Sequence, residues 1–104
     1  TGGGFSENIP RILPDGIGIH IDLDSFALPA MFGWAAEVAE LPAPEMLRTF
    51  NCGIGMIAVC NSEQAESVTE AIRSKGDTAS VIGRVTAHAD GPKVTYTIPK
   101  GWPC

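Results

Sequence analysis

The sequence predicts an α+β domain in which helices pack on one face of a mixed, largely antiparallel sheet of about four strands. Apolar and polar residues alternate over residues 17–22 and 94–98, as they do in half-buried strands. Residues 54–60 end in a continuous apolar run of strand length. Apolar residues recur at helical spacing over residues 28–39 and 65–72. Strands and helices of ordinary length therefore share one chain.

The composition fits one domain with its own core. The chain has 104 residues, of which 44% are hydrophobic, and a formal net charge of −5. With this excess of acidic residues, we do not expect the chain to bind nucleic acid or an anionic membrane surface. The odd cysteine count and the wide spacing of Cys52, Cys60 and Cys104 predict neither a disulfide framework nor a metal knuckle. We expect a reduced, cytoplasmic protein.

The first half reads as a loop, a strand and two helices. Pro14 ends a short helical segment that follows the opening loop, and the strand over 17–22 comes next. The helix over 28–39 carries one apolar face and a second stripe formed by Trp34 and Val38, so we expect it to be covered on two sides. A further short helix is expected from Glu45 to about Phe50.

The second half predicts a strand, a helix and two more strands. Residues 54–60 are expected to form a strand buried on both faces, followed by a helix that Gly76 closes. The strand over 79–87 should form a hairpin at the sheet edge with the strand over 94–98. We therefore expect a domain over 1–98 and an irregular tail over 99–104.

The opening segment carries the first candidate site. Gly2, Gly3 and Gly4 permit positive φ and leave no side chain between the backbone and a ligand. Backbone N–H groups in such a turn, with Asn8 and Arg11 near by, favour an anionic oxygen. On the residues alone, a flexible terminus or a tight turn is the more frequent explanation of such glycines. No lysine follows them at the spacing of a P-loop.

A second polar group precedes another pair of glycines. Arg48 could hold a phosphate with its guanidinium, or pair with Glu45 three residues earlier on the same helix. Asn51 and Gly53 begin a stretch that reads either as a bulge or as room for a ligand. Cys52 is interpreted as a buried, inert thiol rather than an exposed nucleophile.

The carboxylates and histidines predict no metal site. Asp22 and Asp24 could bind magnesium or start a turn, but we expect them to cap a helix because a helix follows. His20 has no second ligand at metal spacing. No catalytic residue can be assigned, so the residues alone predict a ligand-binding half-domain.

Two motifs resemble a known family. TGGGFSENIPR at residues 1–11 resembles the signature T-G-G-G-(F/L)-x-E-N-I-P-R of the phosphoribosylformylglycinamidine cyclo-ligase (AIR synthetase) family. EMLRTFNCGIGM at residues 45–56 is similar to its E-M-x-R-T-F-N-C-G-x-G-M. PAMFGW at residues 29–34 looks like its P-x-(I/V/M)-F-x-W helix, although Phe26 stands where the family usually has Trp. The resemblance ends near Val85.

The resemblance implies an ATP-dependent ligase of purine biosynthesis. The family closes the imidazole ring of formylglycinamidine ribonucleotide and yields aminoimidazole ribonucleotide, ADP and phosphate. The residue types and the resemblance together predict these positions for phosphate or substrate binding: Thr1, Gly2, Gly3, Gly4, Asn8, Arg11, Arg48, Asn51 and Gly53. The resemblance itself points to the glycine loop, to Asn8 and to the segment that begins at Asn51.

The resemblance covers only the later part of the family's C-terminal half. The family's N-terminal half binds most of the ATP and Mg²⁺ and forms the homodimer interface. The chain also starts on the glycine loop without a methionine, so we expect a piece of a longer polypeptide that is inactive alone. Two alternatives stay open. One is a related ATP-using enzyme of the selenophosphate synthetase or thiamine-monophosphate kinase type, and the other is a non-catalytic module that self-associates.

Overall fold

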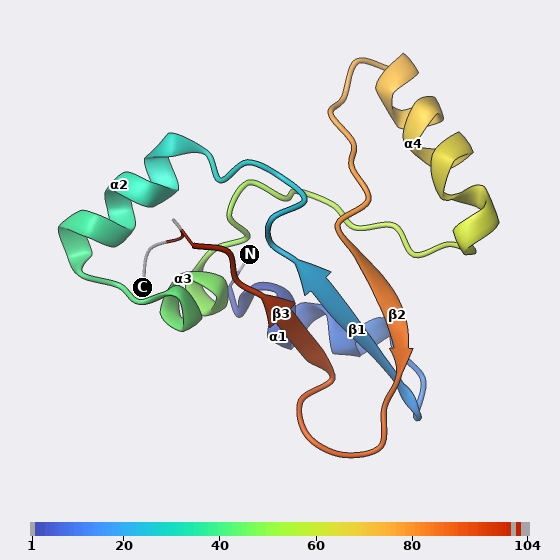
Figure 1. Ribbon diagram of the computed structural model, residues 1–104, viewed down its shortest axis with the longest axis horizontal. Coiled ribbons are helices and arrows are strands. Elements are labelled where there is room, and N and C mark those ends of the chain that lie inside the picture. The colour runs from blue at the N-terminus through green and yellow to red at the C-terminus, as the bar shows by residue number, and fades with distance from the viewer. Residues whose placement is uncertain (1, 101, 103–104) are drawn as a thin grey trace.

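The computed structural model describes residues 2–100 and residue 102 (Figure 1). It contains four α-helices, two 3₁₀ helices and a three-stranded mixed sheet, which confirms the predicted α+β class. In chain order the elements are α1 (Gly4–Asn8), η1 (Ile9–Ile12), β1 (Ile17–Asp22), α2 (Ala30–Ala39), α3 (Ala43–Thr49), η2 (Ser62–Gln64), α4 (Ala65–Ser74), β2 (Gly83–Ala87) and β3 (Val94–Thr97).

β1 is the central strand of the sheet. The strand order is β2-β1-β3, with β1 antiparallel to β2 and parallel to β3. Ile19 stands opposite Val85 on one side and Val94 on the other. Because side chains alternate along a strand, these three residues share one apolar face, while His20 points to the opposite, polar face.

The core lies on the apolar face over β1 and β3. Phe5 and Ile9 of the first helical segments, with Leu47 of α3, pack there against the isoleucines of β1. Burial falls off across the sheet: Val94 is 4% exposed, Ile19 5% and Val85 46%. The covering helices therefore protect β1 and β3 and leave the apolar face of β2 open.

The predicted hairpin between the last two strands is wrong. β3 pairs with β1, in parallel, and β1 separates it from β2. The alternating isoleucines of β1 explain this order, because a central strand with a partner on each side buries Ile19 and Ile21 far better than an edge strand does.

The predicted strand over residues 54–60 is also wrong. No strand is assigned to this segment, and Met56 is 90% exposed. The run has the right composition, but a strand needs a neighbouring edge to satisfy its backbone hydrogen bonds, and this segment pairs with none of the described strands. The sheet therefore has three strands rather than about four, and the strand expected over 79–87 begins only at Gly83.

α2 is not covered on two sides as predicted. It lies at the outside of the molecule (Figure 1), and Met31, Trp34 and Val38 are exposed. The inner side of the helix makes limited contacts, such as that of Phe32 with Phe50, whose ring centroids are 5.7 Å apart. The second apolar stripe thus faces outward.

The tail contributes to the core through Trp102. Its side chain is buried and meets Phe26 edge-to-face at a centroid distance of 6.4 Å. Gly101, Pro103 and Cys104 lie outside the described residues. No helix within the described part of the chain has the length and apolar character needed to cross a bilayer.

Candidate functional site

The two motifs of the sequence meet where α1 packs on α3. Gly4 is buried and has φ +57°, a conformation that favours glycine. A Cβ added at Gly4 would overlap the carbonyl oxygen of Leu47 and lie 3.3 Å from that of Phe50. Backbone therefore touches backbone at this point, and the glycine loop is fixed beside the end of α3.

Asn8 shapes the glycine loop from within. Its Nδ2 donates hydrogen bonds to the carbonyl oxygens of Gly2, at 3.0 Å, and Gly4, at 2.8 Å. Gly3 has φ +89° and precedes α1 as its N-cap. Both amide hydrogens of Asn8 are thus used by the loop, so this side chain positions the loop. Thr1, also predicted at the site, lies outside the described residues.

The second motif ends in a tight turn beside the loop. Cys52 has φ +53° and Gly53 φ +96°, and the Ile54 N–H donates to the Asn51 carbonyl at 3.1 Å. Two successive positive φ values inside such a bond are typical of a type I′ turn. A Cβ at Gly53 would lie 2.8 Å from Cγ of Pro29, so this glycine permits a close approach as well as the turn.

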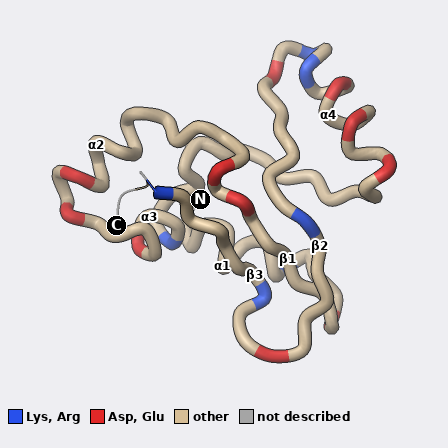
Figure 2. Tube along the Cα trace, viewed as in Figure 1, with Lys and Arg blue, Asp and Glu red and all other residues tan. Residues whose placement is uncertain are grey.

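The cations predicted at the site are exposed. Arg48 pairs with Glu45, with Nη1 and Oε1 3.6 Å apart, which is one of the two arrangements expected for this arginine. Arg11 is exposed in the last turn of η1. Figure 2 shows the basic residues spread over separate parts of the molecule rather than gathered in one patch.

Tyr96 of β3 is a residue that the sequence did not single out. Its ring lies 6.4 Å from that of Phe5, and its buried hydroxyl has no hydrogen-bond partner among the described residues. Burial raises the pKa of Tyr96, the nearby Ser6 side chain offsets part of this rise, and the Cys52 thiol adds to it. Tyr96 therefore lies between the first motif and the second. The alternation of residues 94–98 places Tyr96 on the same apolar face as Val94. Because the predicted hairpin paired this strand with the wrong neighbour, the sequence did not place Tyr96 near the two motifs.

Cys52 is a buried thiol, as predicted. It is 0% exposed, and its Sγ lies 4.0 Å from the Met46 carbonyl oxygen. Burial raises the pKa of the Cys52 thiol, which disfavours the reactive thiolate.

The other candidate groups have local partners. The ring nitrogens of His20 lie 2.8 Å and 2.7 Å from the hydroxyls of Thr95 and Thr97. The predicted helix cap at Asp22 and Asp24 is wrong, because Pro29 precedes α2 as its N-cap and no side chain caps that helix. The Asp24 N–H instead donates to Oδ1 of Asp22 at 3.0 Å, which forms a local turn. Within residues 2–100 and 102, no three His, Cys, Asp or Glu side chains gather to hold a metal ion.

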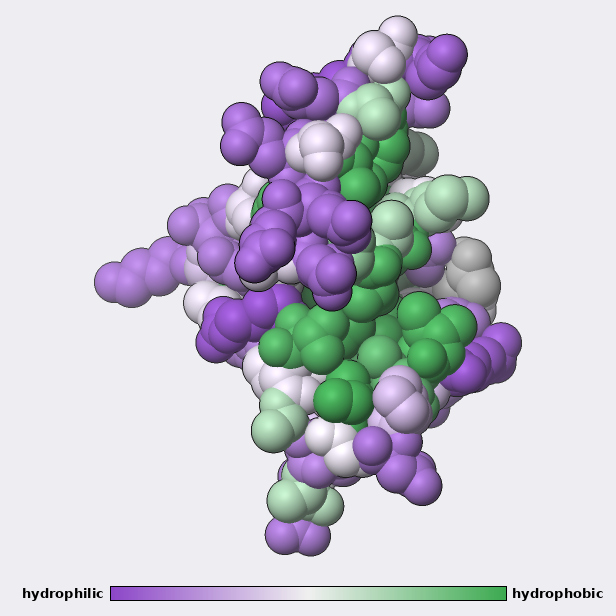
Figure 3. Space-filling view, turned by 90° about the vertical axis from the view of Figure 1, so that its right-hand side faces the viewer, coloured by the Kyte–Doolittle hydropathy of each residue, from purple (hydrophilic) through white to green (hydrophobic). Residues whose placement is uncertain are grey.

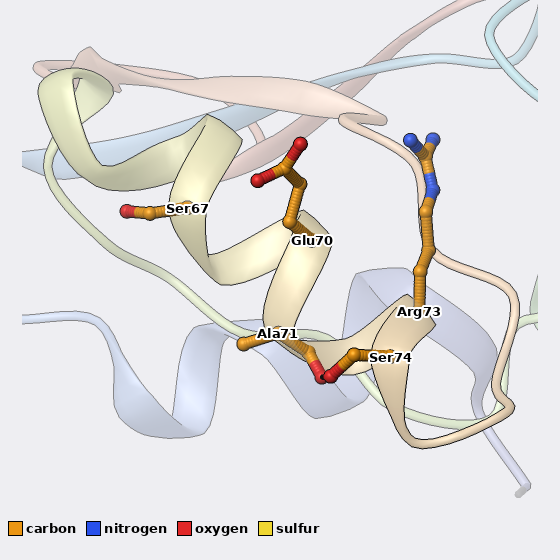
Figure 4. Close-up of a pocket in the computed structure, with 5 residues that line it drawn as sticks. All are labelled: Ser67, Glu70, Ala71, Arg73 and Ser74. Carbon is orange, nitrogen blue, oxygen red and sulfur yellow. Dashed lines mark hydrogen bonds between the residues drawn. The ribbon is translucent and has the colours of Figure 1, made fainter.

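A shallow hollow on α4 is a weaker candidate (Figure 4). Ser67 and Ser74 donate their hydroxyls to carbonyls of the helix turns before them, at 3.0 Å and 2.7 Å. The Arg73 guanidinium donates to the Ala79 carbonyl at 2.8 Å. These donors are occupied locally, so the hollow offers little to a ligand.

The glycine loop and the neighbouring turn are the stronger candidate site. The loop contributes backbone N–H groups at the start of α1, and Arg48 and Arg11 contribute exposed guanidinium groups, which are the kinds of group that bind anionic oxygens. Residues 1–94 match the family described as AIR synthase related protein, C-terminal domain, and the match includes both motifs.

The buried thiol and phenol predict a loss of stability at high pH. Their ordinary pKa values are 9.0 and 10.0, and both are raised in the folded chain. The unfolded chain therefore releases these protons first, so their share of stability is complete below about pH 9 and is lost as pH rises further. Tyr96→Phe should reduce this decline and should not lower stability at neutral pH, because it removes an unsatisfied hydroxyl.

Urea unfolding between about pH 7 and pH 10.5 measures both effects. Cys60→Ala is the matched control, because Cys60 is exposed and should leave the profile unchanged. A decline as steep in Tyr96→Phe as in the parent chain would contradict the proposed role of the buried phenol.

Proposed function

The chain belongs to the AIR synthase related family as a C-terminal domain, and we propose that it serves a phosphoribosylformylglycinamidine cyclo-ligase. Domains of this family are typical of ATP-dependent enzymes. The observation that carries the finer proposal is the contact of Gly4 with the Leu47 carbonyl, which joins the two motifs. Residues 7–11 and 48–52 of these motifs resemble the cyclo-ligase more than its relatives.

The residues at this contact suggest a division of roles. The loop Gly2–Gly4 offers backbone N–H groups to a phosphate, and Arg48 and Arg11 offer exposed positive charge. Asn8 acts indirectly, since its amide holds the loop carbonyls. The turn that contains Asn51 and Gly53 forms the neighbouring wall. Thr1 joins this set only through the motif.

The reaction suits a domain that binds rather than breaks bonds. The γ-phosphoryl group of ATP passes to the amide oxygen of formylglycinamidine ribonucleotide, and ADP leaves. An amidine nitrogen then attacks the activated carbon, phosphate leaves and the imidazole ring closes. Such a sequence depends on positioning and charge neutralisation. The resemblance assigns most of the ATP and Mg²⁺ binding to the family's N-terminal half, so a second half that binds both is part of the proposal.

The proposed partners follow from this reaction. They are a small-molecule ribonucleotide and, for the whole enzyme, a second subunit. A non-catalytic module that self-associates is the second candidate, and the exposed apolar side chains Val81 and Val85 favour it.

A substrate panel tests the proposed activity. The longer protein that we propose to carry this chain should release ADP from ATP with formylglycinamidine ribonucleotide, and not with selenide or thiamine monophosphate. The 104-residue chain alone should release none, because it resembles only the later part of the C-terminal half and the resemblance assigns most ATP and Mg²⁺ contacts to the N-terminal half. Turnover with selenide or thiamine monophosphate would assign the chain to a relative. Turnover by the chain alone would contradict the need for a second half.

Arg48 allows a residue-level test with a matched control. Arg48→Gln in that longer protein should raise KM for the ribonucleotide by about tenfold or more with a smaller effect on kcat, because a guanidinium–phosphate pair is lost. Glu45→Gln breaks the same ion pair and keeps the guanidinium, so its KM should stay unchanged or fall. Equal rises in KM for both variants would show that Arg48 acts only through Glu45.

A further inference from the structure

β2 is an open edge of the sheet. The Asp22 N–H donates to the Ile82 carbonyl at 2.8 Å, and the His88 N–H donates to the Gly16 carbonyl at 2.9 Å, one at each end of the β1–β2 ladder. Because backbone groups alternate in direction along a strand, even-numbered residues of β2 face β1. The N–H and C=O groups of Gly83, Val85 and Ala87 point outward, and no described strand pairs with them.

The side chains at this edge are apolar on one face. Val85 lies on the face of Ile19 and Val94, yet it is about half exposed while they are buried. Figure 3 views the molecule from the side on which β2 and α4 lie and shows apolar surface gathered over its middle. An edge with unpaired backbone and an apolar face is a ready template for another strand.

We infer that β2 pairs antiparallel with β2 of a second copy of this chain, about a two-fold axis through Val85. In this register Val85 faces Val85 of the second copy, and Gly83 faces Ala87. All three are the residues whose backbone groups point outward, so every outward N–H on one edge meets an outward C=O on the other. A shift by one residue would set outward groups against inward ones.

Side chains agree with the same register. The row formed by Val94, Ile19 and Val85 continues across the axis into the identical row of the second copy. Arg84 stands opposite Thr86 of the second copy, so the two arginines are not directly opposed. One strand from each copy makes a small interface, and the dimer is therefore weak and depends on concentration. This assembly does not rest on the proposed enzymatic function.

Amide hydrogen exchange on the unmodified 104-residue chain tests the pairing directly. Val85 and Ala87 amides should exchange about threefold more slowly at about 1 mM than at about 50 µM, for a dissociation constant on the order of 100 µM. Amides of Arg84 and Thr86 should not change, because β1 holds them at both concentrations. Exchange of Val85 that is independent of concentration would overturn the proposal, whether it is fast, from a free edge, or slow, from a segment of the same chain.

A charge exchange at the axis gives a second test by sedimentation equilibrium. Val85→Lys and Val85→Glu should each weaken association at least about tenfold, because like charges then oppose each other, and an equimolar mixture should restore it. Val38→Lys is the matched control: another exposed valine, on α2, whose replacement should leave association unchanged. Protection of Thr86 reports whether each variant keeps the β1–β2 ladder. Equal weakening by Val38→Lys, or unaltered association of Val85→Lys, would contradict the pairing.

Discussion

The contact between Gly4 and the Leu47 carbonyl is the constraint on which the rest of the structure depends. It brings the backbone of α1 against the backbone of α3 with no side chain between them. This approach places Phe5 and Ile9 on the apolar face of β1 and β3 and encloses Tyr96 beneath α1. The same approach sets the glycine loop beside the turn of the second motif, so core packing and the candidate binding site have one origin.

The core lies on one face of the sheet, over β1 and β3. The proposed binding loop belongs to this packed part, and the proposed association surface lies at the uncovered strand β2. β1 and β3 are covered by α1 and α3, and the proposed phosphate-binding loop is part of this well-packed half. β2, α2 and α4 contribute little buried area. In β2 the side chain of Val85 is about half exposed, and α4 has no buried residue. Uncovered edges and faces of this kind favour association with other chains.

The sequence patterns predicted single helices and strands better than they predicted which strands pair with one another. The alternation of residues 17–22 and the spacing of residues 65–72 gave β1 and α4, because strand and helix periods are local properties. Strand pairing is not local: the apolar run ending at Cys60 has strand composition but pairs with none of the described strands, and β3 pairs with β1 across most of the chain. Trp34 and Val38 were predicted to be covered but are exposed, because helical periodicity identifies an apolar face and not the element that packs on it.

The candidate site was predictable only in part for the same reason. The two motifs pointed to the loop and the turn, and both motifs lie within the residues that match the family. Their contact through Gly4, the use of the Asn8 amide inside the loop, and the place of Tyr96 depend on how α1 docks, which no short pattern encodes.

The most direct test of the α1–α3 backbone contact compares the free energies of unfolding of the variants Gly4→Ala and Gly2→Ala. Gly4→Ala adds a Cβ that overlaps the Leu47 carbonyl at a positive φ, so stability should fall by about 2 kcal/mol or more. Gly2 has open space around it, and its replacement should change stability by less than about 0.5 kcal/mol. If the two variants are equally stable, the α1–α3 backbone contact does not organise this fold.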